Sequence, residues 1–180
     1  MNHFELVAQK FKSAGATAND MHKVTGYEAQ YIHASMGLIG EWLELEIADP
    51  ADLDNMKEEL GDILFFYRAL AMVTGYPTVS NEHYVCAVEP EQLSQKISER
   101  INALFDIGKK TLCYAKLMPT DSAIHELLNG LDAMLYKLIE LNGFTVVEIE
   151  ELNDAKLNKR YSKGYSNTEA QQRADKPSGE

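Results

Sequence analysis

Two long segments with helical periodicity are separated by one short break, and this arrangement limits the folds open to the chain. Apolar residues recur at helical spacing over residues 27–47 and again over residues 52–73. Between them, Ala48-Asp49-Pro50 ends the first helix, because proline cannot continue a helix and restricts the residue before it. A connection this short requires the two helices to pack antiparallel. The sequence therefore predicts a helical hairpin at the centre of the fold.

The rest of the chain also follows helical spacing, and no alternating strand pattern competes with it. Thr145 and Glu148 have the spacing of a capping box that opens the last helix. We predict an all-α antiparallel helix bundle, with one domain over residues 1–165 and a polar tail over 166–180. The further helices are predicted at residues 4–11, 90–113, 122–141 and 145–161.

The charge and the cysteine content of the 180 residues exclude several classes of protein. The net charge is -11, which disfavours a non-specific nucleic-acid binder. Two cysteines, Cys86 and Cys113, are too few for a disulfide framework or a zinc site. No run of 18 uncharged apolar residues is present, and the first residues carry charge where a signal peptide is apolar. We expect a cytoplasmic protein with neither a nucleic acid nor a membrane as partner.

Four acidic residues lie on apolar stretches of the predicted hairpin. Residues three apart share a helix face, so Glu41 lies beside Glu44, and Glu59 lies beside Asp62. Packed antiparallel, the two helices bring these four carboxylates together. Such a group is costly to bury, because its members repel one another and lose solvent. A bound divalent cation resolves both problems, and carboxylate ligands favour Mg²⁺ first and Mn²⁺ next.

Two other interpretations of these acids compete with a metal site. A solvated acidic face suits the remaining members of the run, which are Glu46, Asp49, Asp52, Asp54 and Glu58. A di-iron centre in a helix bundle needs Glu-x-x-His on two helices. None of the candidate histidines, His22, His33, His83 and His125, follows a glutamate by three residues. The di-iron interpretation is therefore set aside.

Basic residues gather in the second half of the chain. Lys109, Lys110 and Lys116 lie at the end of the helix predicted over residues 90–113. Asn153, Lys156 and Arg160 are spaced by three and four, so they form one stripe on the last helix. A basic stripe facing an acidic metal site is typical of a triphosphate pocket. The helix dipole alone also favours basic residues near helix C-termini, so the stripe has an alternative explanation.

The segments GEWLE, KEELGDILFFY and NDAKLNKRYSKGYS, in this order, resemble the MazG-like family of all-α nucleoside triphosphate pyrophosphatases. The resemblance covers roughly residues 36–165. It implies cleavage of (deoxy)nucleoside triphosphates between the α and β phosphates, with Mg²⁺ as cofactor. It implies that Glu41, Glu44, Glu59 and Asp62 are the metal ligands and that Glu41 also accepts the proton of the attacking water. The substrate-binding residues implied are Lys109, Lys110, Lys116, Asn153, Lys156, Arg160 and Tyr161.

One departure from the family pattern suggests an internal duplication. Small members carry a Lys-Lys-x-x-x-Tyr-x-Lys stretch between the two acid pairs, whereas here residues 109–116 follow both pairs. We interpret residues 36–76 and 96–144 as two copies, one keeping the acids and the other the bases. The chain would then mimic the family's dimer, as in the dimeric dUTPases, and itself form a homodimer or a larger homo-oligomer. Alternatives are a phosphoribosyl-ATP or dUTP-type pyrophosphatase, or a non-catalytic helical nucleotide-binding protein. The sequence does not indicate which base is preferred.

Overall fold

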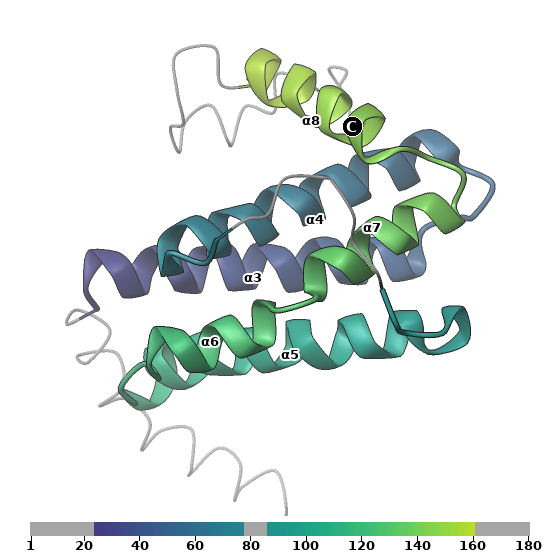
Figure 1. The fold of residues 1–180 in the computed structure, drawn as a ribbon. Coiled ribbons are helices and arrows are strands. Elements are labelled where there is room, and N and C mark those ends of the chain that lie inside the picture. The colour runs from purple at the N-terminus through teal and green to yellow at the C-terminus, as the bar shows by residue number, and fades with distance from the viewer. Residues whose placement is uncertain (1–23, 78–85, 161–180) are drawn as a thin grey trace, which may run out of the picture.

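The computed structural model describes residues 24–77 and 86–160, and the regular structure in these ranges is helical (Figure 1). This confirms the all-α prediction for the described residues. The helix predicted over residues 4–11 and the polar tail lie outside them. Within them, no helix is both long and apolar enough to cross a membrane. The helices are α3 (Gly26–Ile47), α4 (Leu53–Thr74), α5 (Pro90–Tyr114), α6 (Asp121–Leu128), α7 (Leu131–Leu141) and α8 (Val146–Arg160).

The helices of the hairpin begin and end at residues with the expected capping chemistry. Thr25 and Glu28 form a capping box at the start of α3, in which the Thr25 N–H donates to the Glu28 carboxylate at 2.8 Å. Asp52 caps α4 by accepting a hydrogen bond from the Asn55 N–H at 3.1 Å. Gly75 ends α4 in the left-handed conformation, with φ of 65°. The predicted bounds of the two helices are therefore confirmed to within one residue.

The helix predicted over residues 122–141 is wrong in one respect, because the structure divides it into α6 and α7. The break falls at Asn129, which is extended, and Gly130, whose φ of 75° a glycine adopts without steric cost. Arg100 of α5 stabilises the break by donating to the backbone oxygens of Glu126 and Leu127, each at 2.9 Å. These oxygens would otherwise lack partners at the end of α6.

The hairpin of α3 and α4 is completed as a bundle by α5 and by α6 with α7. Helix α5 runs antiparallel to α3, because the Tyr31 hydroxyl donates to the Leu104 oxygen at 3.0 Å and the Trp42 indole N–H donates to Ser98 Oγ at 2.8 Å. The core between these helices is largely aliphatic. Its fully buried members include Leu38, Leu60, Ile63, Leu70, Leu93, Ile97, Ile101, Leu104, Ile124, Leu128 and Leu131. Trp42 is also buried there and thus belongs to the core.

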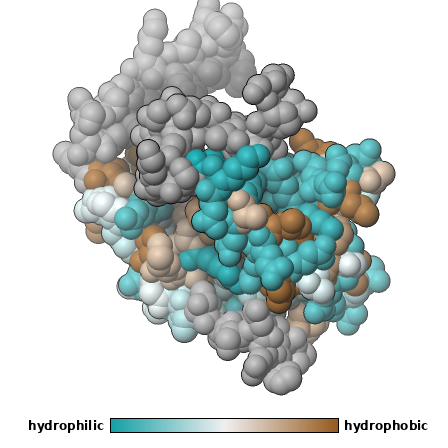
Figure 2. Space-filling view, turned by 90° about the horizontal axis from the view of Figure 1, so that it is seen from above, coloured by the Kyte–Doolittle hydropathy of each residue, from teal (hydrophilic) through white to brown (hydrophobic). Residues whose placement is uncertain are grey.

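Helix α8 crosses α4 on the side away from α5 (Figure 1). Its outer surface is largely hydrophilic, as Figure 2 shows from above. Two ion pairs fix the crossing: Lys57 with Glu148 at 2.6 Å, and Arg68 with Glu150. Thr145 caps α8, since its Oγ1 accepts from the Glu148 N–H at 3.1 Å, while the carboxylate that would complete the predicted capping box pairs with Lys57. This crossing brings the second half of α8 over the middle of α4.

Two helical glycines should respond in opposite ways to replacement by alanine. A Cβ at Gly40 would meet nothing within 4 Å, so Gly40→Ala should raise the free energy of unfolding by about 0.5–1 kcal/mol through helix propensity. A Cβ at Gly61 would lie 2.9 Å from the Cβ of Asn153, so α8 must shift. We expect Gly61→Ala to lower the same free energy by about 1 kcal/mol or more. Urea unfolding measures both, and equal effects would contradict the close approach of α4 and α8.

Candidate metal centre

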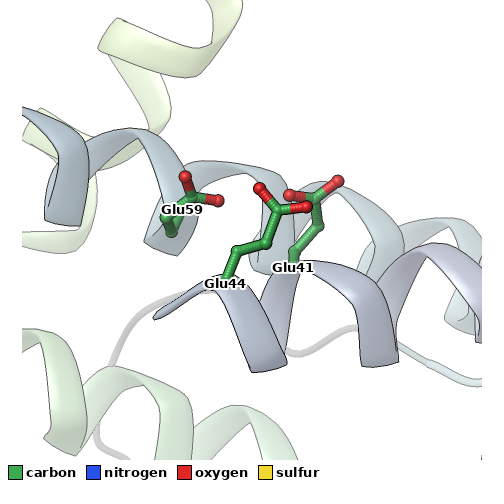
Figure 3. Close-up of side chains that lie close together, drawn as sticks. All are labelled: Glu41, Glu44 and Glu59. Atoms are coloured by element: carbon green, nitrogen blue, oxygen red, sulfur yellow. The ribbon is translucent and has the colours of Figure 1, made fainter. Parts of the chain in front are cut away.

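Three of the four predicted metal ligands converge between α3 and α4. Glu41 and Glu44 lie one turn apart on α3, and Glu59 approaches them from α4 (Figure 3). One carboxylate oxygen from each lies within 4.8 Å of the others. The antiparallel hairpin produces this meeting, because the last turns of α3 lie beside the first turns of α4. These three side chains are called the acidic cluster below.

The acidic cluster combines burial with like charges. Glu59 is buried with 7% of its surface exposed, Glu41 is partly buried and Glu44 is exposed. Burial, and after it the charges of Asp62, Glu44 and Glu59, together raise the pKa of Glu41 to about 8. Burial and the charge of Glu44 likewise raise the pKa of Glu59. Ionised together, these carboxylates need a positive charge among them.

Asp62 lies next to the acidic cluster but is held by α8. Its Oδ1 accepts a hydrogen bond from the Asn153 side chain at 2.7 Å, and its Oδ2 pairs with Lys156 Nζ at 2.5 Å. Lys156 also approaches Glu58 at 3.3 Å. Asn153 is itself buried, with 9% exposed, because the absence of a side chain at Gly61 allows its close approach. Two residues predicted to bind substrate are thus placed beside a predicted metal ligand.

A cavity of about 610 Å³ opens beside the cluster, between α3, α4 and α8. This volume falls within the range of small-molecule sites. Its polar lining residues are Gln30, His33, Glu41, Asp62 and Arg160. The remaining lining residues are apolar: Ala34, Phe65, Phe66, Ala69, Met72, Val73 and Leu157. Arg160, predicted to contact phosphate, therefore reaches the same cavity as two of the predicted metal ligands.

The other predicted basic residues lie elsewhere. Lys109 and Lys110, in the last turns of α5, both pair with Asp106 of the same helix, Lys109 at 2.7 Å. The adjacent Gly108 packs against Ile32 of α3, nine residues before Glu41, which is about 14 Å along a helix. Lys116 is exposed beyond the end of α5. The structure does not bring these three lysines to the acidic cluster, and Tyr161 lies outside the described residues.

Two residues that line the cavity, Gln30 and His33, were not among the predicted site residues. A signal for them exists, because residues 30, 33, 37, 41 and 44 follow the three-and-four spacing of one helix stripe. The prediction from the sequence included the acidic residues of this stripe and not the neutral ones. Phe65 and Phe66 also line the cavity.

Comparisons with known proteins do not assign this geometry to a family. No family model matches the chain, and neither the search of curated proteins nor that of solved structures found a match. A function for this chain is therefore inferred from the arrangement of its side chains.

The raised pKa of Glu41 predicts how stability depends on pH when a chelator is present. The folded protein holds the Glu41 proton more tightly than the unfolded chain does, with a pKa of about 8 against 4.5. The free energy of unfolding should therefore fall as the pH rises from about 4.5 through about 8. Glu41→Gln should flatten this decline, because the amide does not ionise. Thermal unfolding across a pH series measures both slopes, and a stability that rises over this interval would contradict the raised pKa.

Proposed function

We propose that this protein is a metal-dependent nucleoside triphosphate pyrophosphohydrolase, which releases a monophosphate and pyrophosphate. The observation that carries the proposal is the acidic cluster at one end of a ligand-sized cavity, with Lys156 and Arg160 beside it. Carboxylates can hold divalent metals, and the cations can neutralise phosphates. The resemblance in sequence to MazG-like enzymes supports the same reaction.

The residues of the cluster fit a hard divalent cation. All the donors are carboxylate oxygens, which Mg²⁺ and Mn²⁺ prefer. The raised pKa values of Glu41 and Glu59 arise from burial and from negative neighbours, and a cation removes the second cause. Asp62 is the fourth acid in reach, on the α8 side. When bound, Mg²⁺ would polarise the phosphate oxygens and lower the pKa of a water molecule.

The reaction requires a water oxygen to bond to the α-phosphorus while the bond from that phosphorus to the bridging oxygen breaks. Pyrophosphate then leaves with the electron pair of that bond. We assign the water's proton to Glu41, because Glu41 is the member of the acidic cluster that also lines the cavity. Lys156 and Arg160 donate charge-assisted hydrogen bonds to the phosphates, and Asn153 positions Asp62.

The predicted internal duplication and the predicted oligomeric state remain part of this proposal. The hairpin of α3 with α4 and the pairing of α5 with α6 and α7 would be the two duplicated units, the second with a broken return helix. The role of Tyr161 in substrate binding stays a prediction, whereas Lys109, Lys110 and Lys116 lie away from the acidic cluster. We also propose a cytoplasmic homodimer or larger homo-oligomer.

The reaction can be tested by measuring pyrophosphate release from the eight common ribo- and deoxyribonucleoside triphosphates, with Mg²⁺ and with chelator. We expect metal-dependent release from at least one of them. Glu59→Gln should reduce kcat by about 100-fold or more, since it removes a charge that holds the metal. Glu126→Gln, an exposed substitution on α6, is the matched control and should leave kcat within twofold.

Failure of this test would take two distinct forms. Folded protein that releases no pyrophosphate, but whose melting temperature rises with Mg²⁺, would point to a phosphoribosyl or modified nucleotide as substrate. Folded protein whose melting temperature also ignores Mg²⁺ would contradict the enzyme proposal and favour a non-catalytic nucleotide-binding protein.

The positions of the lysines predict unequal effects of their removal. Lys156 lies 2.5 Å from Asp62, so we expect Lys156→Ala to lower kcat/KM by at least about tenfold through lost phosphate contacts. Lys109 pairs with Asp106 on another part of the molecule, so Lys109→Ala should have the smaller effect. Steady-state kinetics of both variants decide this, and a larger loss for Lys109→Ala would show that the end of α5 reaches the substrate.

A further inference from the structure

The two ends of the cavity differ in charge. The acidic end lies toward the C-terminal end of α3, and the neutral end lies toward its N-terminal end. Glu41 and Asp62 mark the acidic end. His33 precedes Glu41 by eight residues and Gln30 precedes it by eleven, which place them about 12 and 16 Å away along α3. Val73, eleven residues after Asp62 on the antiparallel α4, lies at the same far end. The distal end is defined here by Gln30, His33, Ala34, Met72 and Val73.

An aromatic wall connects the two ends. The Phe66 ring meets the Phe65 ring edge-to-face at 5.1 Å and the His33 ring at 6.0 Å. The Phe66 ring occupies the space beside Gly37, where even a Cβ would lie 2.3 Å from it. Phe66 is therefore held between α3 and α4, while Phe65 keeps 42% of its surface exposed. These rings offer a preformed surface on which a planar group can stack.

The distal end is polar without being charged. Among the described lining residues, the charged ones are Glu41 and Asp62 at the acidic end and Arg160 on α8. Gln30 offers an amide that both donates and accepts, and His33 offers ring nitrogens that do the same in the neutral form. An uncharged planar ring with donors and acceptors on its edge matches this chemistry. A polyphosphate without a base, or a sugar phosphate, has no ring that could pack against the apolar wall.

We propose that the distal end binds the base of the nucleotide, and that Gln30 and His33 determine which base is preferred. This inference rests on the proposed function, because it takes the phosphates to lie at the acidic end. The substrate is then a nucleotide in which the sugar and the base extend from the α-phosphate along α3. Gln30 and His33 are exposed when the cavity is empty, and a ring bound across them would cover their polar atoms. A ring whose edge lacks the matching groups would leave these atoms without partners, so it should bind more weakly.

The first test compares Gln30→Ala and His33→Ala with the unchanged protein in the panel of triphosphates. We expect the ratio of kcat/KM between the best and the second-best base to fall by about tenfold in at least one variant. The affinity for Mg²⁺ should stay within twofold, which separates loss of base recognition from damage to the metal centre. Gln92→Ala, an exposed change on α5, is the matched control. Unchanged ratios in an active enzyme would overturn the inference and leave the proposed function standing.

The second test does not need catalysis. Nucleoside 5′-monophosphates are titrated into the full chain with chelator, and the imidazole C–H resonances of His33 are followed by NMR, with His33→Ala used for assignment. We expect saturable shifts with at least one base and weaker binding in Gln30→Ala. Such shifts without any pyrophosphate release would support the base site while contradicting the proposed enzyme. Resonances that no monophosphate moves would overturn the base site, whether or not the enzyme is active.

Discussion

The meeting of like charges between α3 and α4 is the constraint on which the rest of the structure depends. Two ionised carboxylates no more than 4.8 Å apart repel each other by roughly 3.5 kcal/mol or more at an effective dielectric constant of about 20. The hairpin that brings Glu41 and Glu59 together must therefore be held by other contacts. Those contacts are aliphatic: Leu38, Leu60 and Ile63 are fully buried in the core. Burial of each such side chain contributes roughly 1.5–3 kcal/mol, enough to hold the carboxylates against their repulsion.

Helix α8 connects the acidic cluster to the cavity between α3, α4 and α8. It crosses α4 where Gly61 leaves room, and so places Asn153 and Lys156 on Asp62. The ion pair of Lys57 with Glu148 fixes the same crossing at its other end. Lys156 thereby neutralises one of four neighbouring acids, while the acidic cluster keeps its excess of negative charge. One helix thus compensates part of the charge and closes one side of the cavity.

The sequence predicted those features of the site that follow from local rules. Helix bounds depend on capping residues and prolines, and the facing acids depend on a short connection, so both could be read from spacing. The break at Gly130 could not, because isolated helices tolerate a glycine and the contacts of Arg100 with the end of α6 are non-local. The position of Lys109 and Lys110 relative to the acidic cluster could not be predicted from the sequence either. It depends on the register of α5 against α3, which Gly108 and Ser35 set by close contact.

The cavity explains why α3 carries unlike residues on one continuous stripe. Gln30, His33, Gly37, Glu41 and Glu44 follow one another along the helix, changing from neutral polar groups to a bare glycine and then to acids. A core-facing stripe would be apolar throughout, and a solvated one would mix both signs of charge. This order agrees instead with the proposed substrate, whose phosphates would lie beside the acids and whose base would lie beside His33. Phe66 packs against α3 at Gly37, because this residue has no side chain. The aromatic wall therefore requires the glycine in the stripe.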